Sequence, residues 1–267
     1  MILKQDSSLE LNGGFQRYEI DTVQDLKIKL QIHASGSFFF RILNAGKIEI
    51  EGNIPEGNDV SVVFWNDSEG RVETVESYAV DQQGSLHLAY GECNEGETER
   101  SVQVDLNGRS AHTDISSASL VRSRKNYRIL AANHGIKTSA EIKNYAVVLK
   151  EGKLMIDAIG KITKGAAKSK SHQVSRALSF EDGQNTTILP ELLIDENDVE
   201  ASHAMSIGKV DEEQLYYLMS RGLNMRQCTT LISLGYLLPI TDLIRDDDIR
   251  ITLRSELERK VGELCSM

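Results

Sequence analysis

The chain has 267 residues, with 30 basic and 40 acidic side chains and a formal net charge of −10. Its length suits one large domain, or a large domain followed by a small one. The acidic balance and the lack of a basic stripe exclude a typical nucleic-acid binder, because phosphate backbones are bound by clustered Lys and Arg.

The cysteines and the apolar segments indicate where the protein works. Cys93, Cys228 and Cys265 are odd in number and widely spaced, which is typical of a reducing compartment. No segment approaches the ~18 apolar residues that a membrane span needs, and the N-terminus turns polar too early for a secretory signal. We therefore expect a cytoplasmic protein with no membrane or nucleic-acid partner.

Short runs of alternating apolar and polar residues fill the chain from about residue 38 to residue 200. The clearest runs are 47–51, 60–64, 86–90, 102–106, 145–149, 154–159 and 192–194. A period of two places the apolar side chains on one face of a strand, and turn residues such as Asn107-Gly108 separate the runs. The pattern predicts an all-β body, but alternation alone does not separate a sandwich, a barrel and a β-solenoid.

The pattern becomes helical after about Lys209. Asp211 and Asn224 fit N-caps, and each is followed three residues later by a glutamine, as in a capping box. Gly222 and Gly235 fit the ends of these two helices.

A last helix is predicted after the aspartates at 246–248, which favour a helix N-terminus. Its apolar stripe is Ile249, Leu253, Leu257, Val261 and Leu264. We therefore divide the chain into a β body at 1–205 and a helical module at 206–267, which suits docking better than chemistry.

Signatures of catalysis are missing from the sequence. It contains no phosphate-binding loop, no zinc-protease motif, no Cys-x-x-Cys pair and no nucleophile elbow. The six histidines are scattered, and none is at metal-ligand spacing from another histidine or a cysteine, so a closed zinc site is not expected. We expect no enzyme activity and no catalytic residue. On the residues alone, His203 fits a structural histidine better than a ligand.

Two segments near the end of the β body resemble a known family. Residues 198–203, which read Asp-Val-Glu-Ala-Ser-His, and residues 207–223 resemble the C-terminal signature of SufB/SufD proteins, which assemble iron–sulfur clusters. The resemblance is specific over about residues 134–237. It implies a right-handed parallel β-helix with terminal helical parts. It also implies that SufB- and SufD-type subunits pair through their β-helices and dock a SufC-type ATPase through their C-terminal helices.

Ala201 departs from the SufB pattern. SufB-type scaffolds have a cysteine there that is implicated in holding the nascent cluster, and alanine has no thiolate to ligate iron. His203 matches the histidine implicated in SufD-type subunits at the subunit interface, and imidazole is a common ligand of transition metals. The resemblance therefore makes His203 a candidate metal ligand. We expect a SufD-like scaffold with no stably bound cofactor and at most a transient iron–sulfur cluster.

The expected partners are a SufC-like ATPase and either a SufB-like subunit or a second copy of the chain. Gln214, Tyr217 and Arg221 share a helix face by their spacing and are the candidate ATPase contacts. In the alternative interpretation, Tyr217 packs on the β body and Arg221 only complements the helix C-terminus.

Two other hypotheses stay open at this point. One is a homodimeric SufB-like scaffold that itself carries a nascent cluster with His203 and other ligands. Cys93 in the β body is a candidate second thiol. An ordinary packing role is favoured for Cys93. The other is a β-solenoid of another class, such as a polysaccharide-active enzyme, which would need clustered carboxylates or calcium-binding aspartates on one face.

Overall fold

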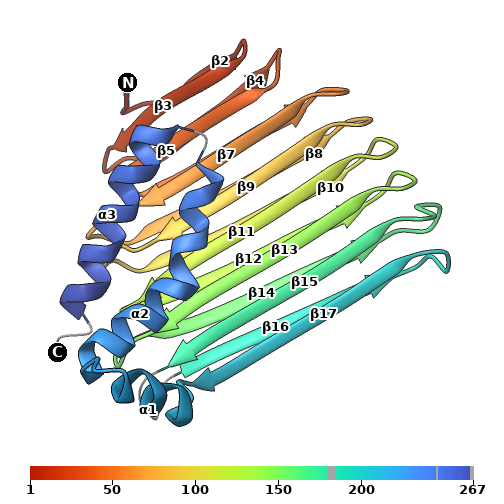
Figure 1. Cartoon of the computed structure of the whole chain (residues 1–267). Coiled ribbons are helices and arrows are strands. Elements are labelled where there is room, and N and C mark those ends of the chain that lie inside the picture. Colours follow the sequence, from red (N-terminus) through yellow and green to blue (C-terminus); the bar gives the residue numbers. More distant parts are fainter. Residues whose placement is uncertain (180–184, 245, 265–267) are drawn as a thin grey trace.

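A parallel β-solenoid forms most of the chain, and helices follow it in the sequence (Figure 1). The computed structural model describes residues 1–179, 185–244 and 246–264. Within these residues each turn contributes one strand to each of two sheets, and all strand pairs are parallel. The predicted parallel β-helix is therefore confirmed.

The odd sheet contains β1 (Ile2–Leu3), β3 (Gly14–Asp21), β5 (Gly36–Asn44), β7 (Asp59–Asn66), β9 (Ser85–Glu92), β11 (His112–Val121), β13 (Ser139–Val148), β15 (Lys170–Ser179) and β17 (Glu200–Lys209), in this spatial order. The even sheet contains β2 (Ser7–Leu11), β4 (Leu26–Ile32), β6 (Lys47–Ile54), β8 (Val72–Val80), β10 (Thr98–Leu106), β12 (Arg124–Asn133), β14 (Lys153–Ile162) and β16 (Asn185–Ile194).

The turns of the solenoid lengthen toward the C-terminus. Ser7 pairs with Ile28 at the N-terminal end of the even sheet, whereas Lys153 pairs with Asn185 at the C-terminal end, so the later turn takes up more of the chain. The strands grow with the turns, from 5 residues in β2 to 10 in β14. The C-terminal turns are therefore broader than the first ones.

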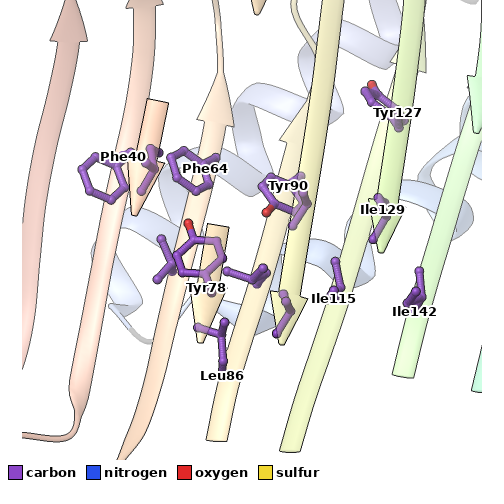
Figure 2. Packing of buried hydrophobic residues seen from close by; sticks show 14 of the residues in the cluster. Phe40, Phe64, Tyr78, Leu86, Tyr90, Ile115, Tyr127, Ile129 and Ile142 are labelled. Carbon is purple, nitrogen blue, oxygen red and sulfur yellow. The ribbon is translucent and has the colours of Figure 1, made fainter. Parts of the chain in front are cut away.

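Ladders of side chains at matching register positions fill the space between the sheets. Phe40, Phe64 and Tyr90 lie in register in β5, β7 and β9. Their rings stack with centroids 5.1 and 5.6 Å apart (Figure 2). The same ladder then changes to small polar residues, where Ser117 Oγ donates a hydrogen bond to Asn144 Oδ1 at 2.6 Å. Each turn thus buries its inner face against the turns beside it.

The helical part contains α1 (Glu212–Ser220), α2 (Met225–Leu237), the 3-10 helix η1 (Leu238–Leu243) and α3 (Asp247–Leu264). Asp211 caps α1 by accepting a hydrogen bond from the Glu213 N–H at 2.9 Å, and the predicted capping box of Asn224 and Gln227 is present at α2. Gly222, at φ +93°, follows α1 as predicted. Each of these helices is too short or too polar to span a bilayer.

One predicted helix end was wrong, and one predicted division lies inside a strand. Gly235 does not end α2, which continues to Leu237. The reason is tertiary, because Leu237 is fully buried among apolar side chains of the odd sheet and α3, and this packing outweighs the low helix propensity of glycine. The division between residues 205 and 206 falls inside β17, because pairing with β15 continues as far as Ser179 and Lys209.

α3 packs on the outer face of the odd sheet and belongs to the body. Ile249, Leu253, Leu257 and Val261 of the predicted stripe are at most 9% exposed and cluster with outward-facing apolar residues of β5 to β13. Leu264 has no described side chain.

Two ion pairs lie at the edge of the contact between α3 and the odd sheet. Arg41 pairs with Glu256 of α3 at 2.9 Å, and Lys260 of α3 pairs with Asp67 at 2.7 Å. The helices of the module therefore pack on different parts of the solenoid. α3 lies along the outer face of the odd sheet, and α1 lies beside the last turns (Figure 1).

Candidate functional site

The last turn of the solenoid ends in an uncovered strand. In the described part of the chain, β17 pairs with β15 on one side and has no strand on the other. Every residue of β17 is exposed. Apolar side chains of this turn are exposed as well: Leu189 43%, Leu193 47%, Met205 52% and Ile207 45%. We call β16 and β17 together the open end.

His203 lies in the open end. It pairs with Gln173, which is 2% exposed and faces the interior, so strand alternation places His203 on the interior side of β17. Gln173 Nε2 donates a hydrogen bond to the Glu191 carbonyl oxygen at 2.9 Å, while its Oε1 is buried without a partner. Ala201 precedes His203 on the same face. The open end thus presents an imidazole, and β16 and β17 contain no thiol.

The exposed face of α1 carries the three predicted partner contacts. No residue of α1 is buried, and Gln214 is exposed. Tyr217 is 55% exposed, and the Arg221 guanidinium lies over its ring, 5.1 Å from the centroid. The alternative in which Tyr217 packs on the β body is therefore wrong, because Leu215 and Leu218 make that contact instead.

The sequence did not predict a charged cluster that lies inside the solenoid. Arg100 forms ion pairs with Glu76 and, at 2.6 Å, with Glu92, and all three side chains are at most 1% exposed. The hydroxyls of Tyr78 and Tyr90 donate to the same Glu76 oxygen at 3.0 and 2.8 Å. The sequence signal was a charged residue at an inward position of an alternating strand, as with Arg100 between Thr98 and Val102.

Lys125 is a second interior cation. It is fully buried, and its ammonium donates to Asn94 Oδ1, to the Gly96 carbonyl oxygen at 2.7 Å and to Thr98 Oγ1 at 3.0 Å. Burial lowers the pKa of Lys125 to about 8, although the nearby Glu92 carboxylate acts in the opposite direction. Its hydrogen-bond acceptors are neutral oxygens, so the burial cost is only partly offset.

Cys93 lies beneath α3 and is 4% exposed. Burial raises the pKa of its thiol to about 12, so the thiol is protonated at neutral pH and is a poor ligand for a metal. Cys228 is also fully buried. Both arrangements favour packing roles over cluster binding.

The fold defines the chain as a parallel β-solenoid with a C-terminal helical module. Comparison with known proteins specifies the class. Residues 51–236 match the family model described as "SUF system FeS cluster assembly, SufBD core domain", and the chain belongs to this family.

Three relatives illustrate the similarity. The chain is 32% identical to the iron-sulfur cluster assembly protein SufD of Bacillus subtilis over 182 residues, which is 67% of this chain and 42% of the relative. It is 25% identical to SufD of Escherichia coli over 121 residues, or 45% of this chain and 28% of that protein. It is 25% identical to SufB of Bacillus subtilis over 183 residues, or 66% and 37%. The chain thus spans less than half the length of these relatives.

The depressed pKa of Lys125 predicts a pH-dependent stability. The pKa is about 8 in the folded protein and ~10.4 in an unfolded chain. Between these values the unfolded state binds more protons, so the free energy of unfolding rises with pH, by at most about 1.4 kcal/mol per pH unit. Below about pH 8 this contribution is flat.

Urea unfolding of the wild type and of Lys125→Met at several pH values measures this effect. Their difference in unfolding free energy should be flat below about pH 8 and rise above it. Lys153→Met, at an exposed position of β14, is the matched control for loss of a lysine. A difference that stays flat across the whole range would contradict the prediction.

Proposed function

We propose that this chain is a SufD-like, non-catalytic scaffold subunit in iron–sulfur cluster assembly. The observation that carries the proposal is the open end, where the edge of β17 and four apolar side chains are uncovered. Ala201, at the position of the SufB-type cysteine, supports a SufD-like role. So does the higher identity to SufD than to SufB of the same organism, 32% against 25%.

Pairing through the open end follows from its chemistry. An uncovered edge strand presents unpaired N–H and C=O groups, and a second solenoid end can satisfy them by continuing the sheet. Met205 and Ile207 are 52% and 45% exposed, so completing their burial is worth roughly half of the ~1.5–3 kcal/mol that full burial of such a side chain contributes. The proposed partner is the end turn of a SufB-like subunit.

Charge at this surface should prevent pairing. We expect Met205→Glu combined with Ile207→Glu to abolish the complex with a co-expressed SufB-like subunit, because two carboxylates would be buried unpaired. Size-exclusion chromatography with light scattering measures the complex.

Ile136→Glu is the matched control, since Ile136 is a 44% exposed apolar residue in a turn outside the open end. An intact complex in the double variant would refute pairing at this surface. A wild-type chain that dimerises alone, and becomes monomeric in the double variant, would identify a second copy as the partner.

His203 is the proposed ligand for the transferred cluster, which is cargo and not a resident cofactor. Its place on the interior side of β17 would put the imidazole at the junction between two paired ends, where a partner's thiolates can complete the ligand set. His203→Ala should therefore lower the cluster content of the paired complex after anaerobic reconstitution.

Iron and sulfide analysis with absorption spectra measures the content. His172→Ala is the control, because His172 is a half-buried histidine of the neighbouring strand β15 whose Nδ1 lies 2.7 Å from Ser202 Oγ. Equal cluster content in the wild type and in His203→Ala would argue against His203 as a ligand.

The exposed face of α1 is the proposed docking surface for a SufC-type ATPase. Tyr216, Tyr217 and Met219 are 77%, 55% and 44% exposed, and Tyr and Arg are the residues that most often dominate binding energy at interfaces. The stacked pair of Arg221 and Tyr217 is a pre-formed amphipathic contact.

Reversing the charge of this pair should weaken docking. We expect Arg221→Glu to lower the affinity for the ATPase at least tenfold, which is about 1.4 kcal/mol. Arg254→Glu is the matched control, because Arg254 is an exposed arginine of α3 paired with Glu258 at 3.4 Å. Calorimetric titration measures both variants. Equal loss in the two variants would point to general electrostatics and count against this surface.

A further inference from the structure

Two histidines that are well separated in the sequence, His87 and His112, meet on the outer face of the odd sheet. His87 lies in β9 directly opposite Asp114 in β11, and His112 precedes Asp114 by two positions on the same strand face. Figure 1 shows β9 and β11 side by side. The two imidazole centroids are 5.8 Å apart. The sequence spacing of the histidines does not reveal this pair, because one turn of the solenoid brings His87 and His112 together.

A single carboxylate oxygen joins the two rings. Nδ1 of His87 and Nε2 of His112 lie 3.0 and 2.9 Å from Oδ2 of Asp114. Each of the three side chains offers one ligand atom, and these atoms all lie within 4.8 Å of one another. Ligands of a tetrahedral zinc ion lie ~2.0–2.2 Å from the metal and so roughly 3.3 Å from each other. Small side-chain rotations can therefore place an ion among the three.

The surroundings favour a cation. The three side chains are half-buried and lie beside a hollow of ≈ 340 Å³, which Asp114 and His87 line together with Glu141 and Asp242. A carboxylate of Asp59 lies 3.7 Å from Nε2 of His87, on the far side of the ring from Asp114. Carboxylates behind ligand histidines fix ring orientation and raise basicity.

Lys143 also lines the hollow. Its ammonium is paired with Glu141 at 2.8 Å, so the Glu141 carboxylate compensates the positive charge that Lys143 brings near the histidines. The hollow keeps one side of the cluster open to water, which leaves room for a further ligand.

We propose that His87, His112 and Asp114 bind one divalent first-row transition cation, such as zinc, and that water completes the coordination from the hollow. Two imidazole nitrogens and one carboxylate oxygen suit such ions, whereas calcium and magnesium prefer oxygen ligands alone. The ligands lie on two hydrogen-bonded neighbouring strands, so the site is held in place before the ion arrives.

Protons are the competitors of the ion at this site. The hydrogen bond to Asp114 raises the pKa of His112, although its partial burial acts in the opposite direction. Partial burial alone would raise the pKa of Asp114, but the hydrogen bonds from His112 and His87 outweigh it and hold that pKa below its ordinary range. The ion takes the place of the protons shared in these two hydrogen bonds.

Cobalt and zinc titrations of the chelator-treated full chain test the proposal. We expect the wild type to bind one equivalent of Co²⁺, with the visible absorption of a low-coordinate ion and no thiolate charge-transfer band. Zinc should displace the cobalt. His112→Gln and Asp114→Asn should each weaken binding at least tenfold, and His87→Gln tests the ligand on the other strand. Circular dichroism verifies that each variant is folded.

His134→Gln is the matched control. His134 Nε2 also lies 3.0 Å from a carboxylate oxygen, that of Asp105, but this pair is not part of the three-residue cluster. Its replacement should leave binding unchanged. The proposal is overturned if the wild type takes up no cobalt, if folded His112→Gln and Asp114→Asn bind as tightly as the wild type, or if His134→Gln weakens binding equally. The measurement uses the isolated chain, so it stands or falls independently of subunit pairing and ATPase docking.

Discussion

The stacking of each solenoid turn on the next, in register, is the constraint on which the rest of the structure depends. A single turn has two short strands and cannot bury its inner face alone. The ladder through Phe40, Phe64 and Tyr90 shows how neighbours solve this, because each ring covers the one before it. Where the ladder changes to Ser117 and Asn144, hydrogen bonds replace ring contacts, so polar side chains are accommodated within the buried core.

The same constraint explains why the two faces of the odd sheet and its last strand differ. The inner face is covered by the even sheet, and part of the outer face of β5 to β13 is covered by the end of α2, η1 and α3. The last turn has no following turn to cover it, and β17 is exposed along its whole length. The last turn thus leaves exposed the surface that each earlier turn buries against the turn after it. The proposed pairing with another solenoid end would use the same kinds of interaction that hold the turns together.

Local signals in the sequence were sufficient for some elements and not for others. The caps at Asp211 and Asn224 were predictable because a cap involves residues only two or three apart. The strands were predictable from alternation, but their arrangement was not, because parallel pairing joins residues that are far apart in sequence. The solenoid fold was predicted from the resemblance to SufB/SufD proteins. The end of α2 was missed for a related reason, since the burial of Leu237 is a tertiary effect.

The buried charged residues and the proposed metal ligands contact partners that are far away in the sequence, so short motifs cannot reveal them. The sequence separation is 24 between Glu76 and Arg100, 27 between His87 and Asp114, and 31 between Asn94 and Lys125. Each of these separations is close to the length of one turn, because every pair joins residues on turns that stack directly on one another.

In a solenoid, side chains that act together are therefore separated in the sequence by about the length of one turn. Residues at this period and on the same strand face become neighbours whatever lies between them. The interior pairs carry a cost, because a buried ion pair is often no more stabilising than apolar packing, while the loss of one partner costs about 3–5 kcal/mol. Arg100 and its two glutamates join β8, β9 and β10 through these buried ion pairs, so the loss of any one of the three side chains would leave a buried charge without its partner. The outward-facing histidines His87 and His112 are only half-buried, so this cost is smaller for them.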